Sequence, residues 1–120
     1  MGDFEKACVP PEGTLLDALR ALERGGAGVA LVVGENRKLV GLMTDGDVRR
    51  AVLKHGDVSS RTAAELMSRN PKTVAAEALV EEALATMEKH AITSLFILET
   101  ATRRPIGIVH LHDLLKASVA

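Results

Sequence analysis

Apolar and polar positions along the chain change twice from helical spacing to strand spacing. Apolar side chains recur every three or four positions over residues 15–22, which predicts an amphipathic helix with Thr14 as its N-cap. Residues 29–33 and 39–43 are continuous β-prone runs separated by turn residues, and they predict a β-hairpin. A short helix is expected to begin at Asp47 and to run to about residue 53.

Two connecting segments carry local signals of their own. Residues 1–11 end in Val9-Pro10-Pro11 and are expected to be extended, because proline disfavours helix there. The sequence Thr62-Ala63-Ala64-Glu65 matches a helix capping box, so we predict a connector helix that ends at Pro71. Residues 72–74 are expected to form a short strand after it.

The second half of the chain repeats the first. The helical pattern recurs 65 positions later, over residues 80–87, and a second strand pair follows it. One extra residue in the second hairpin turn changes the spacing to 66, so Gly107 matches Gly41. At the same spacing Asp113 matches Asp47 and is expected to open the last helix. The second strand pair comprises residues 94–98 and 106–109.

These elements predict an α/β protein built from two βαββα repeats. One such unit cannot cover its own small sheet, so the two copies are expected to pack about a pseudo-twofold axis, with the ligand clefts between them. We place the first repeat and its N-terminal segment at residues 1–58. The connector helix and the second repeat are placed at residues 59–120.

Composition and charge argue against several classes of partner. A formal net charge of −1 and an aromatic content of 2% do not suit a nucleic-acid groove. Cys8 is the only cysteine, so neither an internal disulfide nor a cysteine-based zinc cage can form, which suits a reducing compartment. No apolar run has the length of a membrane span, and the N-terminus lacks a signal-peptide pattern. We therefore expect a cytoplasmic protein with no membrane or nucleic-acid partner.

The junction between strand and helix in each repeat gathers polar groups. In the first copy Gly41 opens the motif, Thr44 lies three places later and Asp47 three places after that. Glycine permits close backbone approach, while a hydroxyl, a carboxylate and free helix N–H groups meet in one small cleft. No nucleophile–base pair, suitably spaced acid pair or phosphate-binding glycine loop is recognisable, so we assign no catalytic residue.

The repeated motif resembles the signature of the tandem CBS domain, or Bateman module, and the resemblance covers nearly the whole chain. Three segments are similar to the C-terminal CBS pair of bacterial arabinose 5-phosphate isomerases, which make a precursor of the lipopolysaccharide sugar Kdo. The resemblance implies a regulatory module that follows a sugar isomerase domain. Because no such domain fits before Thr14, the chain is expected to be a non-catalytic regulatory fragment. The three segments are residues 44–50, 65–73 and 110–115, which read TDGDVRR, ELMSRNPKT and HLHDLL.

The resemblance also implies which residues bind a nucleotide. Asp47 would accept hydrogen bonds from both ribose hydroxyls, and Ile92 with nearby backbone groups would hold the base. Arg49 or Arg50 would help to neutralise phosphate or acid groups. The implied cleft contains Thr44, Asp47, Ser68, Arg69, Lys72, Thr73, Ile92, Thr93 and Ser94.

Plainer interpretations stand beside these assignments. Asp47, taken alone, fits a helix N-cap without any ligand. Arg49 and Arg50 fit a solvated helix surface equally well. Thr93 and Ser94 are also the polar residues expected where a strand begins.

The second cleft implied by the resemblance departs from the motif, because histidine replaces the hydroxyl residue at position 110. Binding of an anion there should strengthen as the pH falls from about 8 to 6, since imidazole becomes charged. A metal site at His110 and His112 is the less favoured alternative, because zinc needs three or four ligands and no third is evident; we assign no metal. The second cleft contains Gly28, Val29, Ala30, His110, His112 and Asp113, with residues 6–10 leading in.

Two classes of function follow for this chain. The first is a nucleotide-sensing regulatory module, whose ligand would be an end product such as CMP-Kdo or an adenine nucleotide such as AMP or ATP. The second is a purely structural dimerisation module with empty clefts. Apolar helix faces on both copies favour a homodimer in either case. We expect no cofactor.

Overall fold

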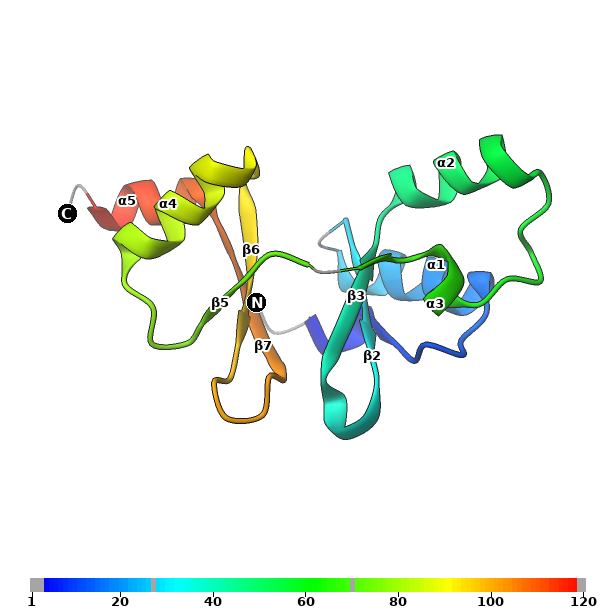
Figure 1. Ribbon diagram of the computed structural model, residues 1–120, viewed down its shortest axis with the longest axis horizontal. Helices are drawn as coiled ribbons and strands as arrows, with labels where there is room; N and C mark the ends of the chain where they lie inside the picture. The colour runs from blue at the N-terminus through cyan, green and yellow to red at the C-terminus, as the bar shows by residue number, and fades with distance from the viewer. Residues whose placement is uncertain (1–3, 27, 70, 119–120) are drawn as a thin grey trace. The chain divides into compact units, whose positions relative to one another are not determined.

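The computed structural model describes residues 4–26, 28–69 and 71–118, and it forms two compact units. The first unit comprises residues 1–71 and the second comprises residues 72–120. The predictions that fell on residues 1–3 and on Asn70 of the connector motif lie outside the described residues. Each unit combines a small sheet with helices, so the predicted α/β class is confirmed (Figure 1).

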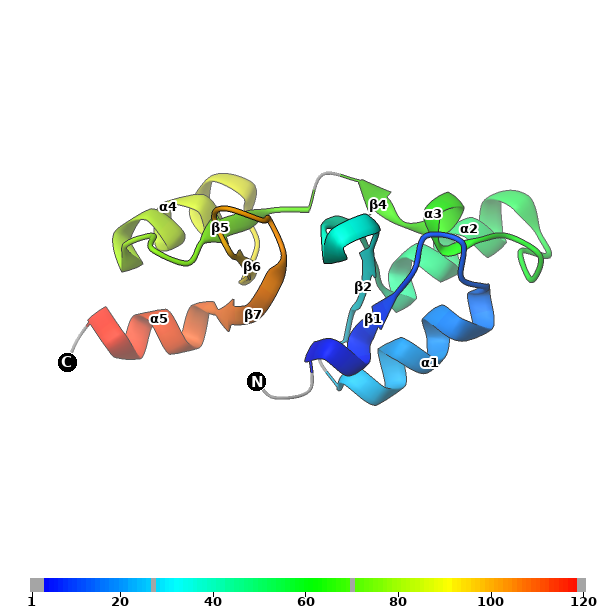
Figure 2. The ribbon, with the colours of Figure 1, turned by 90° about the horizontal axis from the view of Figure 1, so that it is seen from below.

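The first unit contains a four-stranded sheet in the order β1-β2-β3-β4. Strand β1 is parallel to β2, and the other two pairings are antiparallel. Figure 2 shows β1 leading from the short helix η1 and turning back into α1. The elements are η1 Phe4–Ala7, β1 Cys8–Val9, α1 Leu15–Gly25, β2 Ala30–Val33, η2 Glu35–Arg37, β3 Leu39–Met43, α2 Asp45–His55, α3 Ala63–Leu66 and β4 Ser68–Arg69.

The second unit contains a three-stranded sheet in the order β5-β6-β7. Strand β5 is parallel to β6, and β6 is antiparallel to β7, which repeats the pairing of β1, β2 and β3. The elements are β5 Thr73–Ala75, α4 Val80–His90, β6 Ser94–Leu98, β7 Pro105–His110 and α5 Leu111–Ser118.

The strand registers reproduce the spacing found in the sequence. Val32 pairs with Gly41 in the first unit, and Ile97 pairs with Gly107 in the second. Each hairpin has an irregularity immediately after that pair, between Val32 and Val33 and between Ile97 and Leu98. The two halves therefore share one fold down to the position of a β-bulge, which increases the local twist of the strands.

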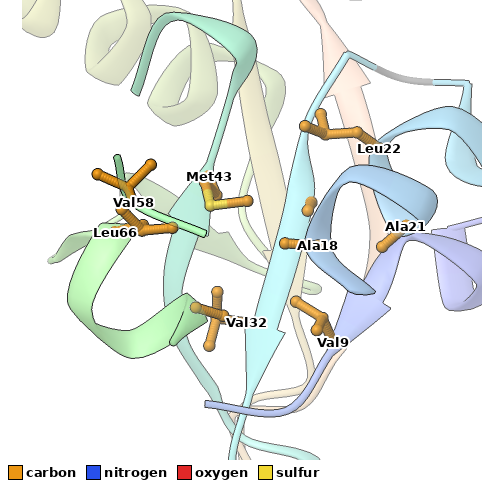
Figure 3. Packing of buried hydrophobic residues seen from close by; sticks show 10 residues of the cluster. Val9, Ala18, Ala21, Leu22, Val32, Met43, Val58 and Leu66 are labelled. Atoms are coloured by element: carbon orange, nitrogen blue, oxygen red, sulfur yellow. The ribbon is translucent and has the colours of Figure 1, made fainter. Parts of the chain in front are cut away.

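The core of the first unit is completed by the connector that follows α2. Helix α1 buries Ala18 and Leu22, as its periodicity predicts, and it also buries Ala21. Leu19, which the periodicity places on the same face, is 36% exposed instead. Val58 and Leu66 of the connector point toward Met43 of β3 (Figure 3) and belong to the same buried cluster. Ala63 and Leu66, which the sequence places with the second repeat, thus belong to the core of the first unit.

The helix starts in the repeated motif differ from the predictions. Helix α2 begins at Asp45 rather than at Asp47, because Thr44 is its N-cap and Asp47 occupies the third helical position. Helix α5 likewise begins at Leu111, two residues before Asp113. In both copies the helix begins within two residues of the end of the strand, so the aspartate lies in the first turn of the helix.

Two segments outside the motif also differ from the predictions. Residues 4–7 form a 3-10 helix where an extended segment was expected, because the prolines begin only at Pro10. The connector helix ends at Leu66 rather than at Pro71, and the two-residue strand β4 follows it. Strand β4 pairs with β3 instead, and this pairing provides hydrogen-bond partners for backbone groups that a longer helix would have bonded internally.

Candidate functional site

Thr44 and Asp47 form a reciprocal capping box at the start of α2. The hydroxyl of Thr44 accepts a hydrogen bond from the backbone N–H of Asp47 at 3.2 Å. The Oδ2 atom of Asp47 accepts two, from the backbone N–H of Thr44 at 2.9 Å and from its hydroxyl at 3.1 Å. These three bonds hold the carboxylate in one orientation and satisfy helix N–H groups that would otherwise lack a partner.

A long-range contact reaches the other carboxylate oxygen. The hydroxyl of Ser68, on β4, donates to Oδ1 of Asp47 at 2.9 Å. Strand β4 can come this close because Gly41 has no side chain: a Cβ there would lie 2.8 Å from Cγ of Met67 and 2.9 Å from the carbonyl oxygen of Ser68. The glycine of the motif is therefore needed for packing of β4, which in turn places Ser68 beside Asp47.

Arg50 is the fourth donor to the carboxylate of Asp47. Its Nη2 atom lies 2.8 Å from Oδ1 of Asp47, one turn earlier on α2. The Arg50 side chain is 65% exposed whereas that of Asp47 is only 10% exposed, so the pair has a fixed inner partner and a solvated outer one. Arg50 folds over Gly46, where a Cβ would lie 3.1 Å from Nη1. The arginine is thus free to exchange the carboxylate for another anion at little cost.

Opposing influences set the charge of Asp47. Partial burial is the largest of them and raises the pKa of the carboxyl. The hydrogen bonds from Arg50, from the backbone and hydroxyl of Thr44, and from Ser68 together outweigh burial, and the pKa of Asp47 falls below its ordinary value. The carboxylate is therefore ionised at neutral pH and can accept hydrogen bonds from a ligand.

The other predicted residues near the end of the first unit and the start of the second are accessible. Arg49 is exposed on α2, one residue before Arg50. Arg69 is exposed on β4, next to Ser68 and paired in register with Gly41. Lys72 is exposed where the second unit begins, and its carbonyl accepts a hydrogen bond from Phe96 at 3.5 Å. Thr73 pairs with the same Phe96.

Within the second unit, Ile92, Thr93 and Ser94 lie where α4 passes into β6. Ile92 is half-buried and packs on the core of that unit, so part of its side chain is available to a ligand. The carbonyl of Thr93 accepts from the N–H of Leu111 at 2.8 Å. Ser94 begins β6 and pairs with His110, in keeping with its plainer interpretation as a strand start.

The second copy of the motif lacks the capping box. His110 and Asp113 are exposed, and no described residue donates a hydrogen bond to the carboxylate of Asp113. Two side chains at positions i and i+2 point to the same side only while the strand continues. Strand β7 ends at His110 and His112 lies in α5, so this condition is not met. Within residues 4–26, 28–69 and 71–118 no three His, Cys, Asp or Glu side chains gather as metal ligands would.

Three further residues of the predicted second cleft lie at the start of β2. Val29 and Ala30 are buried, and Ala30 belongs to the core cluster of the first unit. Gly28 is exposed and has a φ of +77°, a conformation that suits glycine. Because the two side chains are buried, these residues can offer a ligand backbone groups only.

Two features of the site escaped prediction from the sequence. The Thr44-x-x-Asp47 spacing is the same signal that identified the helices after Thr14 and Thr62, so the Thr44 cap was recognisable. The Ser68 contact spans 21 positions and had no local signal, because a two-residue strand has no periodicity to detect.

Comparison with known proteins places these features in a family. The family model for the CBS domain matches residues 3–54 and 63–120. Arabinose 5-phosphate isomerase KdsD of Pseudomonas aeruginosa is 42% identical over 106 residues, which cover 88% of this chain and 32% of that protein. The chain thus spans about a third of the length of this curated relative. No helix in the described part of the chain is long and apolar enough to cross a bilayer.

Solved structures share the fold. Hypoxic Response Protein I, determined with two coordinated zinc ions, has a TM-score of 0.75 and 29% identity, with 91% of this chain and 88% of that chain covered. A CBS domain protein from Pyrobaculum aerophilum, complexed with AMP, has a TM-score of 0.76 at 20% identity and covers 98% of both chains. With two matches of the family model along its length, the chain belongs to the CBS domain family.

Proposed function

We propose that this CBS pair is a nucleotide-binding regulatory module in which Asp47 anchors a ribose. The observation that carries the proposal is the carboxylate of Asp47, which is ionised, nine-tenths buried and held from four directions by Thr44, Arg50 and Ser68. Vicinal ribose hydroxyls need two acceptors at a fixed separation, and an oriented carboxylate supplies them.

Binding of a ribose at Asp47 requires an exchange of partners. A carboxylate has about four lone-pair sites, and the four recorded donors occupy them. Arg50 is the most exposed of these donors, so one ribose hydroxyl displaces it from Oδ1. The second ribose hydroxyl displaces the rotatable hydroxyl of Thr44 from Oδ2. Once released, the Arg50 guanidinium can pair with the phosphate of the same nucleotide, which offsets the loss of its bond to Asp47.

CMP-Kdo is the leading candidate ligand. Support comes from the similarity to arabinose 5-phosphate isomerases. The resemblance described above implies that these enzymes supply a precursor of Kdo, and a regulatory domain is suited to sensing an end product. Arg69, Lys72 and Arg49 are exposed cations that can pair with the phosphate and the sugar-acid carboxylate of this ligand. An adenine nucleotide is the second candidate, favoured by the AMP complex of a protein with the same fold.

The remaining assignments concern the whole protein. We infer that the chain is the non-catalytic part of a cytoplasmic arabinose 5-phosphate isomerase and that it forms a homodimer. Relatives named arabinose 5-phosphate isomerase support the first inference. Exposed apolar side chains on the helices, such as Leu53 on α2 and Leu115 on α5, support the homodimer. The second cleft, around His110 and Asp113, is proposed as a weaker site because its carboxylate is not held in place.

A ligand series tests the proposal. CMP-Kdo should bind more tightly than CMP, and CMP more tightly than cytidine, because each step adds negative charge that the basic side chains can pair. Calorimetry at one salt concentration would rank the three ligands with AMP and ATP alongside, and bound ligand must also raise the melting temperature. Tight binding of AMP without a response to CMP-Kdo would favour the second candidate. Absence of binding by all five would leave the structural dimerisation module.

A further inference from the structure

The second unit has an apolar hollow that the nucleotide site does not use. It has a volume of about 100 Å³ and lies between the N-terminal end of α4 and the sheet. The side chain of Leu79 at the start of α4 is 61% exposed, which is unusual for a residue so close to a core. The lining includes Val74, Ala76, Ala78, Leu79, Ile97 and Leu114.

The internal repeat shows what fills the same place in the first unit. The residues 65 positions before Ala76, Ala78 and Leu79 are Pro11, Gly13 and Thr14. In the first unit the connector helix α3 lies against this stretch: the N–H of Ala63 donates to the carbonyl of Gly13 at 2.8 Å, and that of Ala64 to the carbonyl of Pro11 at 2.9 Å. Thr62 pairs with Thr14 in an isolated bridge.

Side chains of the connector fill the first unit as well. Val58, Ala63 and Leu66 are 2%, 0% and 7% exposed, and all three belong to the core cluster. That cluster also contains Val9 and Val32, the counterparts of Val74 and Ile97 in the hollow. The connector therefore fills, in the first unit, the space that is a hollow in the second.

Nothing in the described part of the second unit takes the place of the connector. No described residue donates a hydrogen bond to the carbonyls of Ala76 and Ala78, the counterparts of the two acceptors that bind α3. Among residues 71–118 the sheet has three strands, and none of them is equivalent to β4 of the four-stranded sheet in the first unit.

We propose that the hollow is a docking groove for a short polypeptide segment with the chemistry of residues 57–67. The occupant is one helical turn with a Thr or Ser cap, two small residues whose N–H groups reach the carbonyls of Ala76 and Ala78, and an apolar residue of leucine size that enters the hollow. Small residues are required because the backbones approach within hydrogen-bonding distance, as they do at Ala63 and Ala64. The inference does not depend on the nucleotide site.

A synthetic peptide with the sequence of residues 57–69 tests the groove. Added to the isotopically labelled chain, it should shift the amide NMR signals of residues around Val74, Ala78 and Leu114, with saturation at high micromolar to millimolar peptide. A matched peptide carrying Ala63→Asp and Leu66→Asp should not. Equal binding of both peptides, or shifts confined to residues 4–71, would overturn the proposal. Shifts that follow the concentration of the chain and not of the peptide would assign the groove to a second copy and would also overturn it.

Two variants complete the test. Ala78→Leu should fill the hollow and weaken peptide binding about tenfold. Ala85→Leu adds the same side chain at an exposed position of α4 and should leave binding unchanged. Leu79→Asp alters only the exposed rim, so it should fold normally while also weakening binding. Unchanged peptide affinity in both Ala78→Leu and Leu79→Asp would refute the docking groove.

Discussion

The hydroxyl of Ser68 donates a 2.9 Å hydrogen bond to the carboxylate of Asp47, 21 positions earlier in the chain. The contact joins the connector to the first turn of α2 and depends on Gly41, which lets β4 lie against β3. Gly41 in β3 and Ser68 in the connector therefore cooperate to orient the carboxylate of Asp47.

Replacement of Asp47 by alanine should weaken nucleotide binding by about 2 kcal/mol, roughly thirtyfold, because both ribose hydroxyls lose their acceptor. Asp17→Ala is the matched control, since Asp17 forms the equivalent capping box with Thr14 on α1. Both variants lose a helix cap, but only Asp47→Ala should lose affinity in calorimetric titration. Equal affinity of the two variants would remove Asp47 from the site.

Replacement of Gly41 by alanine should destabilise the first unit by about 1–3 kcal/mol, because the new Cβ overlaps Met67 and the backbone of Ser68. Displacement of β4 also withdraws Ser68 from Asp47, so nucleotide affinity should fall together with the free energy of unfolding. Gly34→Ala is the control, because its Cβ would have Val40 as nearest neighbour at 3.4 Å, an ordinary contact. Urea unfolding of the two variants measures the difference, and equal stability would contradict the proposed role of Gly41.

Replacement of Arg50 by alanine should raise the pKa of Asp47, because burial then faces fewer opposing hydrogen bonds. In the native chain the lowered pKa means that Asp47 contributes stability at neutral pH, and that this contribution is lost as the pH falls through the folded-state pKa. In Arg50→Ala the loss should begin at higher pH. The change in stability at neutral pH should stay below about 1 kcal/mol, since Arg50 is mostly exposed.

A carboxyl-detected NMR titration of Arg50→Ala measures the pKa of Asp47 directly. Arg49→Ala removes the same charge from the neighbouring exposed position and should leave the titration of Asp47 nearly unchanged. If both variants move the pKa equally, the effect comes from net charge rather than from the 2.8 Å contact.

Replacement of His110 by threonine should give the second copy the cap that it lacks. His110 immediately precedes α5 and corresponds to Thr44, and Asp113 corresponds to Asp47, so a threonine hydroxyl can complete a capping box. We expect α5 to gain about 1 kcal/mol, measured as slower amide hydrogen exchange in its first turn. His112→Thr, inside the same helix, is the control and should give no such gain. Unchanged exchange in His110→Thr would show that the two junctions differ in backbone geometry.

Helices and strands that depend on a few neighbouring residues could be predicted from the sequence. The helix after Thr14, the strand Leu39–Met43 and the strand Ser94–Leu98 were predicted because capping and periodicity are properties of neighbouring residues. The repeat predicted for the same reason that Gly107 corresponds to Gly41, whereas the β-bulge in each hairpin was not predicted. The start of α2 could also have been predicted, because Thr44 and Asp47 have the spacing of a capping box.

Tertiary structure alone decided the contacts between distant segments. Strand β4 exists because it pairs with β3, and its two residues have no strand signal of their own. The bond from Ser68 to Asp47 depends on that pairing, as does the need for a glycine at position 41. The same connector completes the core of the first unit, and a hollow stands in the corresponding place of the second. The repeat and the residue types of the site are local properties, so both could be predicted from the order of residues along the chain. The partners of Asp47 were decided by packing, because they come from segments that meet only when the chain folds.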